Sequence, residues 1–111
     1  YRTTETFYDM TLSTDQKKSL RSIGHKLNPI ITVAGKGITD NINDEIERAL
    51  NDHELIKIKL ICDDREDKPV LTQTICNEHG AELVQTIGHV ILIYRKAAKQ
   101  NKNLSNLVRP L

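Results

Sequence analysis

A short glycine–lysine loop is the stretch of this sequence best suited to chemistry. It consists of Gly35, Lys36 and Gly37. It follows a run of apolar and β-branched residues at positions 30–33, typical of a buried strand, and Thr39 then stands where a helix N-cap belongs. Glycines allow close approach to the backbone, while loop N–H groups, a helix N-terminus and a lysine all favour an anion. The segment indicates either a phosphate-binding loop or a plain connecting turn, since glycines also occur in turns for steric reasons.

The charges of the 111-residue chain are segregated, although the net charge is only +1. Residues 13–37 carry a net charge of +4, and residues 83–111 carry five bases and no acid. Residues 38–82 hold twelve acids and five bases, a net charge of −7. Such segregation favours one surface that meets a polyanion. A solvated basic tail and a solvated helix face would give the same pattern.

A capping box formed by Ser13 and Gln16 predicts a first helix over residues 14–24. The apolar residues of this helix recur on one side, and cationic residues gather on roughly the opposite side. The cationic residues are Lys17, Lys18, Arg21 and His25, and Lys26 follows them. Their side of the helix is either an ordinary solvated face or an extension of the phosphate-binding surface.

The rest of the chain alternates helices and strands. A second helix is expected over residues 40–51, a second strand over 55–62, a third helix over 69–79, and two hairpin strands over 81–87 and 90–94. Two strands joined by one helix form a right-handed βαβ unit, so the first two strands should be parallel. The order αβαβαββ predicts an α/β fold, an α+β sandwich with one four-stranded mixed sheet packed with helices.

The chain has the length of one domain and shows no internal repeat. We expect a flexible N-terminal segment over residues 1–11, a folded domain over 12–96 and a polar, basic tail over 97–111 that is mobile from residue 101 onward. No stretch approaches the roughly 20 apolar residues that span a bilayer, and no secretory signal is visible. Cys62 and Cys76 are expected to be free thiols of a reducing compartment. A cytoplasmic protein without a membrane partner is therefore predicted.

Candidate catalytic and metal-binding residues are few. Cys76 and His79 have a spacing compatible with shared metal ligation on a helix, and Cys62 would be a third ligand. A structural zinc normally needs four ligands in recognisable pairs, and no second pair is near. A cysteine nucleophile assisted by a histidine is as weakly supported, because buried thiols are poor nucleophiles. We expect no metal, no cofactor and no enzyme activity.

Three blocks of sequence are specific when taken jointly. They are L-R-S-I-G-H-K-L-N-P-I-I-T-V-A-G-K-G-I-T at residues 20–39, I-E-R-A-L-N-D-H-E-L-I-K-I-K at 46–59 and V-Q-T-I-G-H-V-I-L-I-Y-R at 84–95. From about Leu12 to Lys96 the chain resembles the bacterial YhbY proteins, the single-domain form of the CRM domain, named for chloroplast RNA splicing and ribosome maturation. The resemblance implies an RNA-binding domain similar to the C-terminal domain of translation initiation factor 3. It also implies a non-enzymatic protein associated with precursors of the large ribosomal subunit.

The resemblance assigns RNA contact to one loop. The GxxG loop of the family falls on residues 34–37, with Ala34 in place of the first glycine and Gly37 matching the last. We expect the charge of Lys36 to compensate for the missing glycine. The predicted RNA-binding residues are therefore Gly35, Lys36, Gly37, Lys17, Lys18, Arg21, His25 and Lys26, with Arg95 and Lys96 beside them.

The expected partner is RNA, in particular ribosomal RNA of the large-subunit precursor, bound by a monomer with no small-molecule substrate. Aromatic stacking platforms are scarce, since Tyr94 is the one candidate inside the predicted fold. Recognition should therefore depend on phosphates and shape. The alternative is a protein-docking module that reaches the pre-ribosome through a protein partner. It would use the acidic helix 40–51 or the side chains of Leu104, Leu107 and Val108.

Overall fold

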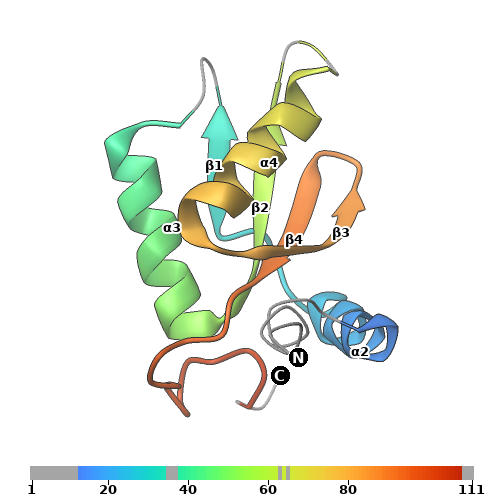
Figure 1. Ribbon diagram of the computed structural model, residues 1–111, viewed down its shortest axis with the longest axis vertical. Coiled ribbons are helices and arrows are strands. Elements are labelled where there is room, and N and C mark those ends of the chain that lie inside the picture. Colours follow the sequence, from blue (N-terminus) through green and yellow to red (C-terminus); the bar gives the residue numbers. More distant parts are fainter. Residues whose placement is uncertain (1–12, 35–37, 63, 65, 109–111) are drawn as a thin grey trace, which may run out of the picture.

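The computed structural model describes residues 13–34, 38–62, 64 and 66–108, which form helices and strands in the order αβαβαββ (Figure 1). The helices are α2 (Thr14–Gly24), α3 (Asp40–His53) and α4 (Asp67–His79). The strands are β1 (Ile31–Ala34), β2 (Leu55–Ile61), β3 (Glu82–Ile87) and β4 (Val90–Tyr94). The predicted order of elements is confirmed, and each end lies within one or two residues of its predicted position.

The four strands form one mixed sheet in the order β1-β2-β4-β3. β1 runs parallel to β2, with Ile31 opposite Ile58, as expected for two strands joined through a helix. β4 lies between β2 and β3 and is antiparallel to both. Gly88 turns β3 into β4 with a φ of 56°, the positive value that a type II′ turn requires at its first central position. The α+β fold with a four-stranded mixed sheet is therefore confirmed.

The main core lies between one face of the sheet and the helices α3 and α4. β2 alternates so that Ile56, Ile58 and Leu60 point to this face, where each is at most 1% exposed. Ile46 of α3 and Ile75 of α4 meet them and have no exposed surface. Burying an aliphatic side chain of this size stabilises a fold by roughly 1.5–3 kcal/mol. The alternation of β2 therefore fixes which sheet face the two helices cover.

Helix α2 covers part of the opposite sheet face. Leu20 and Leu27 pack there against Leu55 of β2 and Leu92 of β4. The approach is close, because a Cβ added to Gly24 would lie 2.5 Å from a Cδ of Leu92. Glycine at the end of α2 thus lets this helix pack directly on β4, an interior strand of the sheet.

Local sequence signals set the helix ends. Ser13 and Gln16 form the predicted capping box, with the Ser13 Oγ accepting the Gln16 N–H at 3.1 Å and the Gln16 Oε1 accepting the Ser13 N–H at 2.9 Å. The Thr39 Oγ1 accepts the Ile42 N–H at 3.2 Å at the start of α3. Gly80 ends α4 with a φ of 61°, a left-handed conformation that favours glycine. No helix in the described ranges has the length and apolar character needed to cross a membrane.

Residues 97–108 pack against the domain in a series of turns. Ser105 is fully buried and Asn106 is 7% exposed. The Asn106 N–H donates to the His53 carbonyl at 3.0 Å, and Leu107 joins the cluster beneath α2. This described part of the tail is docked, which differs from the mobile tail that the sequence predicts.

Candidate nucleic-acid interface

Five of the predicted site residues gather on α2 and the turn that follows it. Lys18, His25 and Lys26 are exposed, and Lys17 and Arg21 are partly exposed. At 100° per residue the four from Lys17 to His25 share one flank of the helix, away from the buried leucines. We call these five residues the α2 surface.

The other flank of α2 faces the C-terminal segment. Asp15, Gln16 and Ser19 line a shallow hollow there with Tyr94 and Leu107. The acid of α2 therefore points to a different side from the cations. Tyr94, at the end of β4, therefore lies beside the flank of α2 that carries Asp15 and not beside the flank that carries the cations.

Strand β2 adds two lysines to the sheet face that α2 covers. Alternation along the strand points Lys57 and Lys59 away from the main core, on the same side as Leu55. The Lys57 Nζ donates to the Leu27 carbonyl at 3.0 Å, directly beneath the end of α2. Lys59 is exposed two residues further along, beside Thr32 of β1. The sequence shows this alternation but not which face a helix leaves partly open, so the prediction missed both lysines.

The predicted loop of Gly35, Lys36 and Gly37 lies outside the described residues. Its neighbours on either side are described. Ala34 is exposed at the end of β1, and Thr39 caps α3. The N-terminus of α3 follows directly, and the free N–H groups of such a terminus favour an anion.

The length of β1 separates these loop neighbours from the α2 surface. Ala34 pairs with Ile61 of β2, whereas the end of α2 meets β2 at Lys57. Four residues of strand correspond to about 13 Å. Figure 1 shows α2 near one end of the sheet and the arrowhead of β1 at the other. The arrangement therefore suits an extended ligand that follows the sheet, and it suits less well a ligand that is held at a single tight bend.

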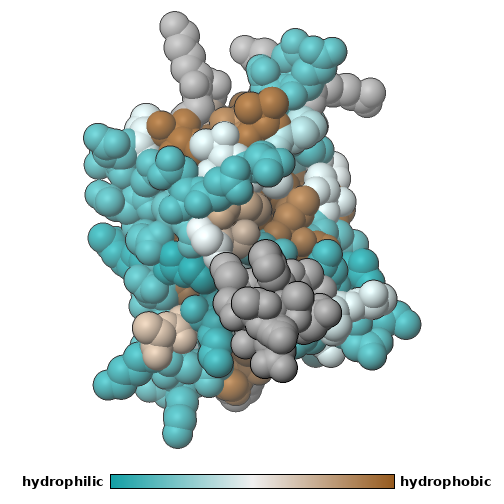
Figure 2. Space-filling view, viewed as in Figure 1, coloured by the Kyte–Doolittle hydropathy of each residue, from teal (hydrophilic) through white to brown (hydrophobic). Residues whose placement is uncertain are grey.

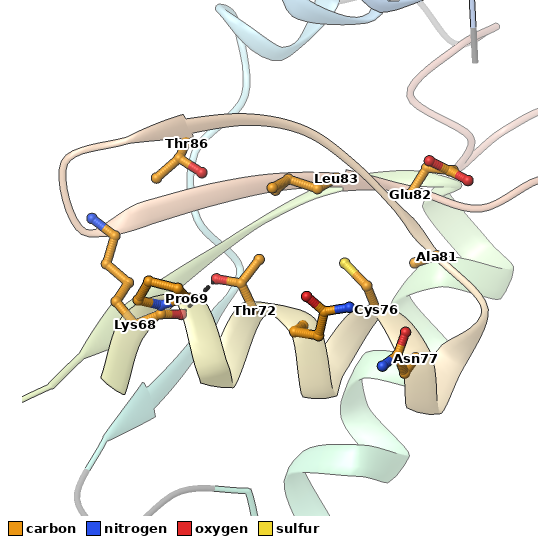
Figure 3. Close-up of a pocket in the computed structure, with 10 residues that line it drawn as sticks. Lys68, Pro69, Thr72, Cys76, Asn77, Ala81, Glu82, Leu83 and Thr86 are labelled. Carbon is orange, nitrogen blue, oxygen red and sulfur yellow. Dashed lines mark hydrogen bonds between the residues drawn. The ribbon is translucent and has the colours of Figure 1, made fainter. Parts of the chain in front are cut away.

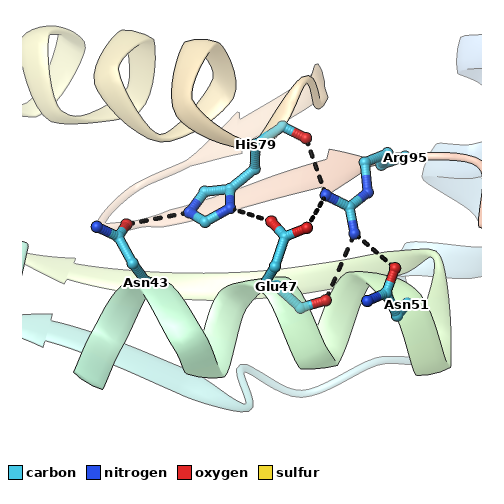
Figure 4. Close-up of polar contacts among 5 residues, drawn as sticks. All are labelled: Asn43, Glu47, Asn51, His79 and Arg95. Atoms are coloured by element: carbon cyan, nitrogen blue, oxygen red, sulfur yellow. Dashed lines mark hydrogen bonds and ion pairs between the residues drawn. The ribbon is translucent and has the colours of Figure 1, made fainter. Parts of the chain in front are cut away.

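Arg95 lies on the other face of the sheet (Figure 4). Its guanidinium donates to the Glu47 Oε1 at 2.8 Å, to the Asn51 Oδ1 at 2.8 Å and to the His79 carbonyl at 3.0 Å. Its side chain is 18% exposed. Lys96, the next residue, is exposed. The structure does not bring Arg95 to the α2 surface, because these contacts tie its guanidinium to α3 and α4.

His79, which the sequence offers as a metal ligand, belongs to the same network (Figure 4). Its Nδ1 donates to the Glu47 Oε2 at 2.5 Å, and its Nε2 lies 3.1 Å from the Asn43 Oδ1. The hydrogen bond from His79, assisted by Arg95, holds the pKa of Glu47 below its ordinary value against the opposing effect of burial. No group of three or more His, Cys, Asp or Glu residues in the described part of the chain is arranged to hold a metal ion.

A hollow of about 480 Å³ lies between α4 and β3 (Figure 3). Lys68 stands at one end of it and Glu82 at the other, with Leu83 between them. Cys76 also lines it, and burial, followed by the negative charge of Glu82, raises the pKa of the Cys76 thiol. A raised pKa disfavours the thiolate, which is the reactive form. This hollow therefore offers neither a reactive thiol nor the excess positive charge that attracts a polyanion.

The fold and the site together define a class of protein. It is a small α+β domain in which a helix on one face of the sheet carries a cationic flank. The chain belongs to the CRS1/YhbY (CRM) domain family, whose family model matches residues 12–95. The resemblance that the three sequence blocks indicate is therefore confirmed.

Two relatives and one solved structure resemble the chain over most of its length. The probable RNA-binding protein PA4753 of Pseudomonas aeruginosa is 50% identical, over 90% of this chain and 96% of its own. An RNA-binding protein of Haemophilus influenzae is 48% identical, over 77% of this chain and 86% of its own. The solution structure of the hypothetical protein SAV1595 of Staphylococcus aureus matches with a TM-score of 0.71 and 37% identity, over 86% of this chain and 98% of its own. Both relatives are named for RNA binding and not for a reaction, in keeping with a chain that is not an enzyme.

Proposed function

We propose that this chain is a monomeric, cytoplasmic RNA-binding protein whose partner is ribosomal RNA in precursors of the large ribosomal subunit. The observation that carries RNA binding is the α2 surface, where five basic side chains gather while the acid of α2 faces another side. Lys59 and the lysine beneath α2 continue this surface along the sheet. The names of the relatives support RNA over another polyanion. The ribosomal partner is inferred from the resemblance to YhbY proteins.

Recognition through phosphates follows from the placement of Tyr94, the aromatic residue within the described ranges. Tyr94 packs into the cluster with Leu20 and Leu107. Burial, and then the charge of Glu54, raises the pKa of its phenol. No Phe, Tyr or Trp side chain in the described ranges therefore belongs to the α2 surface, where the ring of His25 is the one aromatic group on which a base can stack. Contacts to phosphates and RNA shape then favour a structured RNA over a sequence motif.

The proposed monomer agrees with the distribution of exposed apolar side chains. The face seen in Figure 2 is mainly hydrophilic, with hydrophobic residues in small separate patches. Scattered exposed apolar residues are normal on a monomer, whereas a large continuous patch marks an interface. The exposed large apolar residues come from different elements and include Ile30, Ile61, Val70, Ile87 and Val108.

Salt-dependent binding tests the proposal directly. Fluorescence anisotropy with fragments of large-subunit ribosomal RNA should give a log–log salt slope of roughly −0.7 to −0.9 per phosphate neutralised. The double variant Lys18→Glu/Arg21→Glu should bind at least about tenfold more weakly, because two attractive contacts become repulsive. Lys102→Glu is the matched control, since it changes an exposed lysine of the C-terminal segment. Equal affinity of the double variant and the control would contradict the proposal.

The ribosomal partner needs a separate test. Crosslinking followed by sequencing of the bound RNA should enrich ribosomal RNA of the large-subunit precursor over messenger and transfer RNA. The protein-docking alternative predicts instead that association with pre-ribosomes survives nuclease treatment. Loss of association after nuclease digestion, together with enriched ribosomal RNA, would decide for direct RNA binding.

A further inference from the structure

A third hollow, of about 220 Å³, opens at the end of the sheet where β1 and β2 begin. The turn after α2, the end of α3, the first residues of β2 and the docked C-terminal segment all line it. Three of its lining residues are basic, namely Lys26, His53 and Lys57. No carboxylate is among the described residues that line it. We call this hollow the basic pocket.

Hydrogen bonds position two of these basic groups. The Lys57 Nζ donates to the Leu27 carbonyl at 3.0 Å, which uses one of the three N–H bonds of an ammonium group. The His53 Nδ1 lies 2.8 Å from the Leu104 carbonyl, which can only accept, so Nδ1 carries the proton. The Nε2 of the neutral His53 ring then carries the lone pair and donates only in the imidazolium form, so Lys26 and Lys57 are the donors of the pocket in either form. Donors on fixed stems at the rim of a pocket are suited to hold an oxyanion.

The helix ends around the basic pocket would oppose an anion if their carbonyls were left unpaired, because the C-terminus of a helix carries a partial negative charge. Both ends are capped by donors. At the end of α2 the Ile23 carbonyl accepts the Lys26 N–H at 3.1 Å, and at the end of α3 the His53 carbonyl accepts the Asn106 N–H at 3.0 Å. The full charges of Lys26 and Lys57 therefore outweigh the partial charges of the helix ends.

We propose that the basic pocket binds a phosphate group of the RNA, an inference that rests on the proposed RNA-binding function. Its volume is below the roughly 300–1,000 Å³ of pockets for drug-sized ligands, which suits one phosphate and its sugar. Ile30 is 53% exposed at the pocket and supplies an apolar wall for a ribose. Lys26 belongs to both the α2 surface and the basic pocket. A strand bound along α2 can therefore place its next phosphates at the entrance of β1 and β2.

Two variants test the assignment. Lys26→Gln removes an exposed charge, and Lys57→Met removes the ammonium but keeps most of the stem. Each should weaken binding of a large-subunit ribosomal RNA fragment about tenfold, as expected for loss of one charge-assisted contact. Each should also reduce the log–log salt slope by roughly 0.7–0.9 per lost contact. Lys102→Gln is the matched control, and thermal unfolding of Lys57→Met shows whether loss of its bond to Leu27 has perturbed the fold.

A titration of the wild-type protein with inorganic phosphate, against potassium chloride of equal ionic strength, tests the pocket without RNA. The NMR signals of the His53 ring and of the Asn28 and Lys57 amides should shift first and saturate together. Unchanged RNA affinity and salt slope in both variants, while the wild type binds RNA, would overturn the pocket and leave the proposed function standing. Absence of any localised phosphate shift would also overturn it. Localised NMR shifts on addition of phosphate, in a protein that binds no RNA, would show that the basic pocket binds phosphate but would overturn the proposal that this phosphate belongs to RNA.

Discussion

Ser105 donates its hydroxyl to the Glu54 Oε1 at 2.8 Å and so ties the C-terminal segment to the turn between α3 and β2. Glu54 is 2% exposed and lies at a φ of 63°, a conformation that L residues rarely adopt. Its carboxylate also accepts the Ala97 N–H at 2.9 Å and the Gln100 Nε2 at 2.6 Å. One buried carboxylate therefore accepts hydrogen bonds from three residues of the segment that follows β4.

The variant Glu54→Ala should destabilise the fold by about 3 kcal/mol, because buried donors left without an acceptor cost roughly 1–3 kcal/mol each and part of the segment can turn to water. Glu45→Ala, at an exposed position on α3, is the control and should change stability by less than about 0.5 kcal/mol. The measurement is urea unfolding followed by circular dichroism. A midpoint for Glu54→Ala equal to that of the control would show that the segment does not depend on this carboxylate.

Acid should destabilise the fold through Glu54 and Glu47. Burial alone would raise the pKa of Glu54, but hydrogen bonds from Ala97, Gln100 and Ser105 outweigh it and lower that pKa below 4.5. The pKa of Glu47 is lowered chiefly by its hydrogen bond from His79. Because both are lower in the folded than in the unfolded chain, their stabilisation is present in full above pH 4.5 and is lost as pH falls through the lowered values.

Urea midpoints measured in steps between pH 3 and pH 7 check this expectation. The midpoint should be nearly constant above about pH 5 and should fall below it. In Glu54→Gln the fall should be shallower, since one of the linked protonations is gone. An equally steep fall in that variant would mean that other carboxylates cause the acid sensitivity.

Replacing Arg95 should affect stability more than RNA affinity. Arg95→Met removes the bonds to Glu47 and Asn51 and leaves these groups to water, so a loss of about 1–2 kcal/mol is expected. The guanidinium lies on the sheet face opposite α2, so the dissociation constant for RNA should change less than about twofold. Unfolding and anisotropy measurements on one preparation separate the two effects. A tenfold loss of RNA affinity with unchanged stability would show instead that Arg95 contacts RNA, as the sequence predicts.

The close approach of Gly24 to Leu92 should make Gly24→Ala destabilising, although alanine favours helices over glycine by about 1 kcal/mol. The added Cβ would lie 2.5 Å from a Cδ of a side chain that is 1% exposed, and overpacking of this kind costs about 1–3 kcal/mol. We expect a net loss of about 1 kcal/mol in unfolding free energy. Ser22→Ala, at an exposed position of α2, is the control. In the background Leu92→Ala, the change Gly24→Ala should instead be stabilising, and a destabilising effect there would exclude the steric explanation.

Lys36→Glu tests the loop that the family resemblance assigns to RNA. RNA affinity should fall about tenfold, because one attractive phosphate contact becomes repulsive. The unfolding temperature should stay within about 2 °C of the wild type, as expected for a surface substitution. Unchanged affinity would remove the loop from the interface and leave the α2 surface as its main part.

The elements themselves could be predicted because their signals are local. The capping box at Ser13, the alternation of β2 and the glycine of the hairpin turn each lie within a few residues of what they determine. Helical spacing likewise placed the cations of α2 on one flank. The main core followed from these patterns without knowledge of any distant contact.

The parts that could not be predicted depend on partners far away in the sequence. Arg95 follows a strand as a surface cation would, and only the fold brings Glu47, 48 residues away, to its guanidinium. Ser105 and Asn106 show no apolar periodicity, yet they are buried because Glu54 and Leu55 bond to them. The basic pocket gathers residues from four segments, namely the turn after α2, the end of α3, the start of β2 and the C-terminal segment, so no spacing in the sequence predicts it.

The central position of β4 has a consequence for synthesis of the chain. Until residues 90–94 have been made, one edge of β2 has no neighbouring strand, and the backbone N–H and C=O groups along that edge have no partner in the sheet. A nascent chain that ends before Val90 therefore contains all the described helices but cannot complete the sheet. Completion of this domain therefore waits for its last strand, and a chain truncated before that strand should be a substrate for proteases and chaperones.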